Sequence, residues 1–224
     1  WLDHRQIILQ RKSQHRLSQI ENRINILNGY ITVYLNLDKV IEIIRELESK
    51  YSKAHLVHRI DRDTSGCLVI ALKKSFLRTL HQEIRNKDVD KIYDLIVFGE
   101  WPKNLNSIEA PLSKERIGSG EKEAIVQSDG KPSITQFKVI KSTQKFSQLK
   151  AKILTGRMHQ IRAHTKFKGY PVVGDRKYGD ENLNKNERKN GLNRMLLHAF
   201  SINFKNLGIE CTAETPKLFS EMMS

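Results

Sequence analysis

The stretch HRIDRDTSG, residues 58–66, sets the expectations for both fold and site, because it is a charged turn between two apolar segments. The apolar pair Leu56–Val57 precedes it, and the apolar run CLVIAL, residues 67–72, follows it. This run is short and does not alternate, which favours a buried strand over a helix. A charged turn beside a buried strand is a frequent place for catalytic groups. Two interpretations remain open here: a solvated, salt-bridged loop, or a functional loop centred on Asp61.

Asp61 is flanked by Arg59 and Arg62, whose positive charges favour the ionised form of a nearby carboxyl group. An ionised carboxylate can act as a nucleophile, a base or a metal ligand. A second basic segment, RMHQIRAHTKFKG at residues 157–169, is predicted to be helical. One of its arginines could turn inward to meet Asp61, and the alternative is a solvated basic helix. The expected helix carries Arg157, His159, Arg162 and His164.

Strands and helices mix along the chain without a regular βαβ repeat, which predicts an α+β fold with a mostly antiparallel central sheet flanked by helices. Helices are predicted at 38–50 and at 75–87, the second capped by Ser75. The polar segment 180–193, DENLNKNERKNGLN, is predicted to be a surface loop. Strands are predicted at 91–101, 133–142, 146–154 and 194–204.

Charge is the most informative property of the composition. The 224 residues include 39 Lys and Arg against 25 Asp and Glu, a net charge of +14, which favours a polyanionic partner such as nucleic acid. No apolar run approaches the roughly 20 residues of a membrane span, and the first residues are too charged for a signal peptide. With only Cys67 and Cys211, a zinc site is not expected, and a reducing compartment, the cytoplasm, is. A monomer is expected, since no heptad pattern stands out.

Four separated motifs occur in an order that resembles the RluA-type pseudouridine synthases, and the resemblance covers about residues 38–220. They are HRIDRDTSG, KIYDL at 91–95, GRMHQIRAH at 156–164 and NRMLLHAF at 193–200. The segments IEAPL, GKPSITQFKV and GLNRMLLHA are most similar to the branch called RluC, which modifies uridines of large-subunit ribosomal RNA. The resemblance implies a pseudouridine synthase fold with a cleft across the sheet. It also implies isomerisation of uridine within RNA without a metal, nucleotide or other cofactor.

The resemblance assigns a role to six residues, each by the motif that it matches. Asp61 in HRID corresponds to the catalytic aspartate, and Arg162 in HQIR to the arginine that pairs with it. Arg59 corresponds to the arginine that enters the RNA stack when the target base flips out, and Tyr93 in KIY to the tyrosine that stacks on that base. The apolar lining of the uracil pocket corresponds to Ile161 and Leu197.

The same resemblance bears on the loop and on the domain organisation. His58 and Thr64 are expected to be structural members of the loop. The Lys-Pro-x-Gly loop that family members carry upstream does not occur in residues 1–57. Residues 16–36 are similar to part of an S4-type RNA-binding domain. We therefore expect a catalytic domain at 38–224, preceded at 1–37 by a partial RNA-binding segment or, as the alternative, by the edge of a larger domain.

Other functions are less consistent with these residues. A non-catalytic ribosomal RNA-binding or ribosome-assembly protein with the same fold would explain the charge, but not the set of Asp61, Tyr93 and Arg162. A metal-dependent nuclease using Asp61 and Asp63 would place Arg62 against its metal ion. A kinase is excluded because no glycine-rich loop accompanies HRIDRD.

Overall fold

The computed structural model describes Arg45, Ser49 and residues 54–117 and 121–224. The RNA-binding segment expected at 1–37 lies outside the described residues, as does almost all of the helix expected at 38–50. The segments that carry the four motifs are described throughout.

The described chain alternates short strands with a few helices, and none of these helices is long and apolar enough to cross a membrane. The elements follow one another as β1 (His55–Leu56), β2 (Ser65–Gly66), β3 (Ile70–Ala71), α3 (Lys74–Asn86), β4 (Val89–Phe98), β5 (Ser107–Glu109), β6 (Leu112–Ile117), β7 (Glu121–Val126), β8 (Ile134–Ser142), β9 (Phe146–Ile153), α4 (Gln160–Phe167), α5 (Glu181–Lys189), β10 (Leu197–Phe204), η1 (Lys205–Leu207), β11 (Ile209–Thr212) and α6 (Leu218–Glu221).

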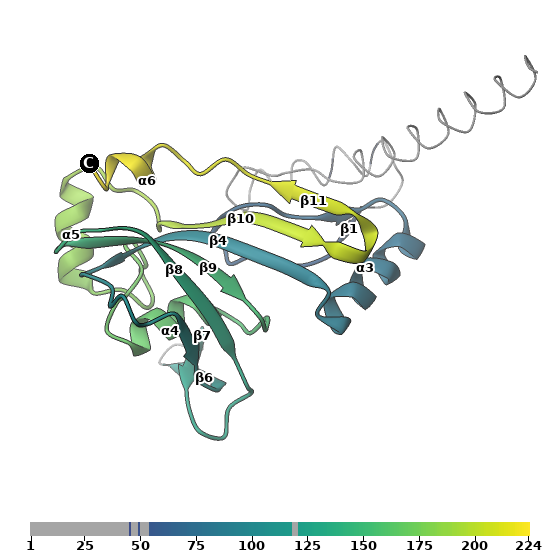
Figure 1. The fold of residues 1–224 in the computed structure, drawn as a ribbon, viewed down its shortest axis with the longest axis horizontal. Coiled ribbons are helices and arrows are strands. Elements are labelled where there is room, and N and C mark those ends of the chain that lie inside the picture. Colours follow the sequence, from purple (N-terminus) through teal and green to yellow (C-terminus); the bar gives the residue numbers. More distant parts are fainter. Residues whose placement is uncertain (1–44, 46–48, 50–53, 118–120) are drawn as a thin grey trace, which may run out of the picture.

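A seven-stranded sheet forms the centre of the molecule, in the order β11-β10-β4-β9-β8-β5, with β2 pairing in parallel with β10. All other neighbours in this sheet are antiparallel. In Figure 1, α4 and the β6–β7 hairpin lie below the sheet, with α3 near one end of the sheet and α5 and α6 near the other. The predicted α+β architecture with a mostly antiparallel sheet is confirmed.

The centre of the sheet is buried on both faces because β4 is apolar in consecutive positions. Leu95 and Val97 pack into one hydrophobic cluster, while Ile96 and Phe98 pack into another, as expected for side chains that alternate between the faces of a strand. Full burial of one such side chain contributes about 1.5–3 kcal/mol to stability. Tyr93, two residues before Leu95, packs against the first cluster, so this face carries the site described below.

The charged turn of residues 58–66 is fixed to the sheet at its end. Gly66 pairs with Ala199 of β10 at a φ of 112°, and a Cβ atom there would lie 2.2 Å from the Ala199 carbonyl oxygen. Only glycine fits so close a backbone approach. The Cys67 N–H then donates to the Ala199 carbonyl at 2.8 Å, and the Ser65 hydroxyl hydrogen-bonds His198 Nδ1 at 2.7 Å. The turn therefore follows the short strand β1 and ends on the central sheet, which holds Asp61 in place.

Three local predictions are wrong. Ser75 is not a cap, because α3 begins at Lys74 and the capping residue is Lys73, whose side chain makes no cap hydrogen bond. The basic helix begins only at Gln160, so Arg157 and His159 precede it. The Gln160 Oε1 atom accepts from the Arg157 backbone N–H at 3.0 Å and from the Thr155 hydroxyl at 2.8 Å, which holds the preceding turn out of the helix.

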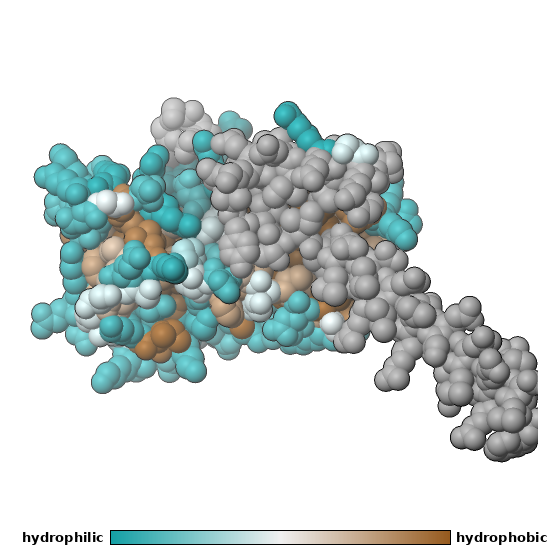
Figure 2. Space-filling model, turned by 90° about the horizontal axis from the view of Figure 1, so that it is seen from above, coloured by the Kyte–Doolittle hydropathy of each residue, from teal (hydrophilic) through white to brown (hydrophobic). Residues whose placement is uncertain are grey.

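The third error is the segment predicted to be a surface loop, which contains helix α5. Its N-terminus is capped by Asp180, whose Oδ1 accepts from the Leu183 N–H at 3.0 Å. Asn184 and Glu187 on its inner face are buried. Hydrophilic residues cover most of the described surface in Figure 2, with hydrophobic residues in small patches between them.

Candidate active site

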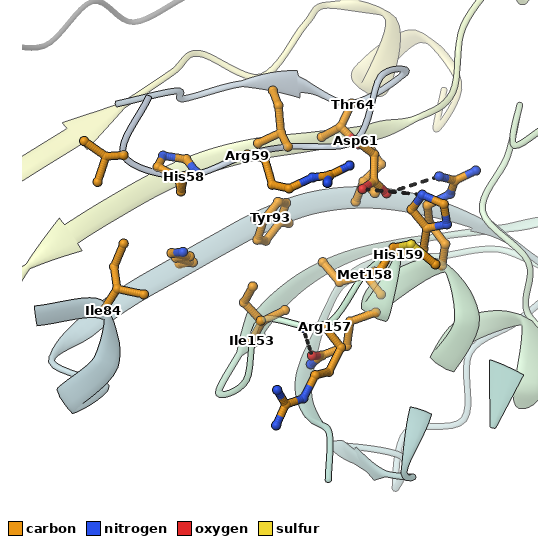
Figure 3. Close-up of a pocket in the computed structure, with 18 of the residues that line it drawn as sticks. His58, Arg59, Asp61, Thr64, Ile84, Tyr93, Ile153, Arg157, Met158 and His159 are labelled. Atoms are coloured by element: carbon orange, nitrogen blue, oxygen red, sulfur yellow. Dashed lines mark hydrogen bonds and ion pairs between the residues drawn. The ribbon is translucent and has the colours of Figure 1, made fainter. Parts of the chain in front are cut away.

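A cavity of about 420 Å³ opens over β4, between the charged turn and the segment that leads into α4. Figure 3 shows Asp61 and His159 facing each other at one end, His58 and Ile84 at the other, and Tyr93 between. The structure brings together all six residues singled out by the sequence, since the cavity is lined by Arg59, Asp61, Tyr93, Ile161, Arg162 and Leu197.

Asp61 is held at the end of the cavity by an arginine from α4. Its Oδ2 atom lies 3.1 Å from Arg162 Nη1, although the two residues are 101 positions apart in the chain. The Arg162 side chain is 5% exposed and that of Asp61 is 18% exposed, so solvent screens this pair only weakly. The arrangement presents one carboxylate oxygen to the cavity beside a buried positive charge.

A second carboxylate, Asp175, fixes Arg162 from behind, and the sequence analysis did not identify it. Arg162 Nε donates to Asp175 Oδ2 at 2.7 Å and Nη2 donates to Oδ1 at 2.8 Å, a bidentate contact. Asp175 Oδ1 also accepts from the Lys177 and Tyr178 backbone N–H groups, each at 2.9 Å. In the sequence Asp175 directly follows the apolar pair Val172–Val173 and Gly174, a pattern that is equally typical of a surface turn.

Burial and charge oppose each other in this cluster. Burial alone would raise the pKa of Asp175, but the hydrogen bonds and charge of Arg162, with the two backbone N–H groups, lower it. Burial alone would lower the pKa of Arg162, but Asp175 and Asp61 together raise it. The ion pair therefore stays charged inside the protein, and Arg162 is fixed in one orientation toward Asp61.

His159 lies on the other side of Asp61 and precedes α4 with a φ of 51°. Its Nε2 atom is 3.8 Å from Asp61 Oδ1, and its Nδ1 atom is 2.9 Å from the Tyr178 hydroxyl. The Ala124 N–H of β7 donates to the same hydroxyl at 2.7 Å and takes one of its acceptor positions, while the Asp61 carboxylate favours a proton on the facing Nε2 atom, so that the Tyr178 proton is donated to His159 Nδ1. We infer that the ring carries its proton on Nε2, the atom facing Asp61.

The electrostatics of His159 agree with a neutral ring. Burial lowers its pKa, with further lowering by Arg162 and Lys177, against an opposing effect of Asp61 and Asp175. Burial likewise raises the pKa of Tyr178 to about 12, so its hydroxyl stays protonated. A neutral Nε2–H donor beside Asp61 is thus the expected state.

Tyr178→Phe should change the His159 tautomer and lower stability. The Ala124 N–H loses its buried acceptor, which should reduce the free energy of unfolding by about 1–3 kcal/mol in urea denaturation. The nitrogen chemical shifts of His159 should show an Nε2-protonated ring in the wild type and a mixture of tautomers in the variant. An unchanged tautomer would contradict this role of the Tyr178 hydroxyl.

Tyr93 offers an open aromatic face because its neighbours on the adjacent strands are small. It pairs with Ala199 of β10 on one side and with Ala151 of β9 on the other. Burial, with a smaller effect of Asp61, raises the pKa of Tyr93, so the phenol is neutral. Ile161 and Leu197 are both buried on the same face, and they give the cavity an apolar wall beside the ring.

Arg59 and Asp63 differ from Asp61 in exposure, since both side chains are exposed. In Figure 3 the Arg59 guanidinium points along the cavity toward Asp61. Among residues 54–117 and 121–224, no group of three or more His, Cys, Asp or Glu side chains is placed to hold a metal ion.

A family model and the curated relatives of this chain agree with each other. The family model described as RNA pseudouridylate synthase matches residues 34–167. The protein named ribosomal large subunit pseudouridine synthase C from Haemophilus ducreyi is 45% identical over 167 residues, covering 75% of this chain and 52% of its own length. The protein of the same name from Escherichia coli K12 is 42% identical over 171 residues, covering 75% of this chain and 54% of its own. The chain thus spans about half the length of the curated relatives that it matches.

A solved structure agrees in fold. The structure titled Human RNA Pseudouridylate Synthase Domain Containing 1 superposes with a TM-score of 0.67 at 25% identity, covering 85% of this chain and 82% of the human one. The residues matched by the family model include the turn with Asp61 and all of α4, the two segments that meet in the cavity. By its sequence and its fold, this chain belongs to the RNA pseudouridylate synthase family.

Proposed function

We propose that the chain isomerises uridines of large-subunit ribosomal RNA to pseudouridine, with Asp61 as the catalytic residue. The observation that carries the proposal is the Asp61 carboxylate, held 3.1 Å from Arg162 in a cavity that also exposes the ring of Tyr93. The names of the relatives and the net charge of +14 support ribosomal RNA as the substrate.

The reaction needs no oxidant and no second substrate. The C1′–N1 bond of uridine breaks and a C1′–C5 bond forms, while the C5 proton leaves to solvent and N1 gains a proton. A carboxylate can assist by attacking carbon or by stabilising charge that develops on the sugar. In this assignment Asp61 meets the sugar, Tyr93 stacks on the base, and Ile161 and Leu197 enclose it. Arg162 is a positioning residue for Asp61.

The uridine must leave its stack before Asp61 can reach it, at a cost of a few kcal/mol. We assign Arg59 to the space that the base vacates, because its side chain is exposed at the mouth of the cavity. We further propose a monomer acting in the cytoplasm, a setting that fits the two free thiols of Cys67 and Cys211.

The proposal is tested with a large-subunit ribosomal RNA transcript labelled with tritium at C5 of uracil. Purified protein should release tritium to water without shortening the RNA, because the C5 proton is lost while the backbone stays intact. Binding of the transcript without release of tritium would favour a non-catalytic RNA-binding protein. Shortened RNA would favour a nuclease.

Arg59→Ala should lower the rate of modification more than it weakens RNA binding. The contacts assigned to Arg59 form only after the base has left the stack, so they stabilise the flipped state rather than the first complex. We expect the single-turnover rate at saturating RNA to fall by about tenfold or more, equivalent to about 1.4 kcal/mol.

Lys74, an exposed residue at the start of α3, provides the comparison for a phosphate contact. If it touches the RNA backbone, Lys74→Ala should reduce the slope of log affinity against log salt by about 0.7 for single-stranded RNA and leave the saturated rate unchanged. Full recovery of the Arg59→Ala rate at high RNA concentration would make Arg59 a phosphate contact as well, and the base-flipping role would be wrong.

A further inference from the structure

Two buried side-chain atoms in the described part of the chain have no hydrogen-bond partner, and both belong to residues that line the active-site cavity. They are His58 Nδ1 and Thr64 Oγ1. Buried polar atoms are nearly always paired, and an unpaired one costs about 1–3 kcal/mol. Thr64 lies near Asp61, while His58 lies at the far end of the cavity (Figure 3). The expectation that His58 is only a structural member of the loop leaves its Nδ1 atom unexplained.

The hydrogen bonds of His58 show that its unpaired atom is a donor. The Val69 N–H donates to His58 Nε2 at 3.1 Å, so Nε2 carries no proton and Nδ1 carries the one of the neutral ring. Burial lowers the pKa of His58 to about 3, with a further effect of the Lys91 charge and a smaller opposing effect of the Arg59 backbone. At neutral pH the ring is therefore neutral, and its Nδ1–H group has only a weak contact with the Arg59 backbone in place of a full hydrogen bond.

Lys91 supplies a second donor at the same end of the cavity. It lies two residues before Tyr93 on β4, so both side chains face the cavity that they line. Burial lowers the pKa of Lys91, and its ammonium group makes no hydrogen bond or ion pair with the described residues. The neighbouring carboxylate of Asp90 is already bound by Lys152 at 3.0 Å and Lys205 at 3.1 Å.

The charges around Lys91 favour an anion. Asp61 is the one carboxylate among the described residues that line the active-site cavity, and it lies at the other end. A second cavity of about 470 Å³ shares Lys91 and continues past it, lined also by Arg85, Lys87 and Arg157 and by Asp90, whose carboxylate is already bound by two lysines. A strand of RNA that leaves the active site in this direction meets positive charge along its path.

We propose that His58 and Lys91 form a phosphate subsite that holds a non-bridging oxygen of the RNA backbone next to the base stacked on Tyr93. Residues two positions apart on a strand, such as Lys91 and Tyr93, lie about 6.6 Å from each other. This length fits the span from a base to the phosphate of its own nucleotide. The subsite rests on the proposed function for RNA as the ligand. It fixes the direction in which the backbone leaves the target nucleotide, from Tyr93 past Lys91 toward Arg85 and Lys87.

The test is binding of fluorescein-labelled pentauridylate, compared with the same oligomer in which every linkage is an uncharged methylphosphonate. Measurements use the Asp61→Asn protein, so that turnover cannot change the probe. Lys91→Met should weaken binding of the charged oligomer by about tenfold and reduce the salt slope by about 0.7. It should leave binding of the uncharged oligomer unchanged, which also shows that the variant is folded.

His58→Gln keeps an acceptor for the Val69 N–H and removes the Nδ1 donor, so it should weaken binding of the charged oligomer by a smaller factor. Lys185→Met, an exposed lysine on α5, is the matched control and should change binding by less than about twofold. The subsite is wrong if Lys91→Met changes the affinity for the charged oligomer no more than Lys185→Met does, or if His58→Gln leaves that affinity unchanged. It is also wrong if Lys91→Met weakens binding of both oligomers equally, which would indicate a contact with the base.

These experiments distinguish a failure of the phosphate subsite from a failure of the proposed isomerase activity. Release of tritium by the wild type with no effect of Lys91 on the charged oligomer would remove the subsite and keep the isomerase. The expected effect of Lys91 without release of tritium would keep an RNA-binding subsite and remove the isomerase.

Discussion

Asp61→Asn should abolish release of tritium from C5-labelled RNA, with a loss of at least about a thousandfold in rate, equivalent to about 4 kcal/mol. An amide has nearly the shape of the carboxylate, so Arg162 can still donate to its oxygen, but the amide is neutral and a poor nucleophile. RNA affinity should stay within about tenfold, about 1.4 kcal/mol, because binding is spread over many cationic side chains. Single-turnover rates and equilibrium binding of the same transcript measure the two quantities.

Asp63→Asn is the matched control for this prediction. Asp63 belongs to the same turn but is exposed and does not line the cavity. Its substitution should leave the rate within about twofold, as for other surface changes. Appreciable turnover by the Asp61→Asn protein, or an equal loss in both variants, would remove Asp61 from the chemistry and leave the turn with a binding role alone.

The sequence located the main parts of this site because each part belongs to a short motif. The charged turn between two apolar segments already singled out Asp61. The pairing of Asp61 with Arg162 was expected from the resemblance, and the contact at 3.1 Å joins residues 101 positions apart. The strands followed from the alternation and β-branched content of their own residues, and β4, β8, β9 and β10 were all expected.

Residues that act through long-range contacts could not be found in this way. Asp175 fixes Arg162, but nothing local distinguishes it from an acidic residue in a surface turn. Tyr178 orients His159 only because α4 packs beside β7 and places the Ala124 N–H against its hydroxyl. Such roles depend on which segments meet in space, and periodicity does not encode that.

Helix α5 shows the limit of composition as a guide. Its segment is rich in Asn and Lys, which is typical of loops. Buried polar contacts hold it instead: Asn184 donates to the Asp175 carbonyl at 2.8 Å and accepts from the Gly174 N–H at 2.8 Å, while Glu187 pairs with Lys145 at 2.8 Å. Through Asn184 the helix supports the backbone that carries Asp175, so it contributes to the site without touching the cavity.

Arg162 lies between two carboxylates, and it donates more hydrogen bonds to Asp175 than to Asp61. Asp175 takes its Nε and Nη2 atoms in a bidentate contact, while Asp61 takes Nη1 alone. The Tyr178 ring also lies 4.8 Å from the guanidinium, so three neighbours fix its plane. The position of the charge beside Asp61 is thus set by Asp175, which makes Asp175 a positioning residue in the proposed reaction.

Asp175→Asn should therefore lower both stability and rate. Breaking a buried ion pair from one side costs about 3–5 kcal/mol of stability at neutral pH. Without its bidentate partner Arg162 can turn wholly onto Asp61, which would neutralise the oxygen presented to the substrate. We expect the single-turnover rate at saturating RNA, measured below the melting temperature, to fall by about a hundredfold, or about 2.7 kcal/mol. The dissociation constant of the RNA should change little.

Asp94→Asn separates positioning from stability, because Asp94 is also a buried carboxylate, paired with Lys150 at 2.7 Å, but does not line the cavity. The Asp94→Asn protein should have a lower free energy of unfolding and an unchanged single-turnover rate at saturating RNA.

The pH dependence of stability gives a second test, since the pKa of Asp175 is lowered on folding. Its carboxylate stabilises the protein fully above the unfolded pKa of about 3.9, and this contribution is lost as the pH falls below that value and through the lower pKa of the folded state. The stability difference between wild type and Asp175→Asn should then shrink below about pH 4. Equal single-turnover rates for the Asp175→Asn and Asp94→Asn proteins at saturating RNA would reduce Asp175 to a purely structural residue.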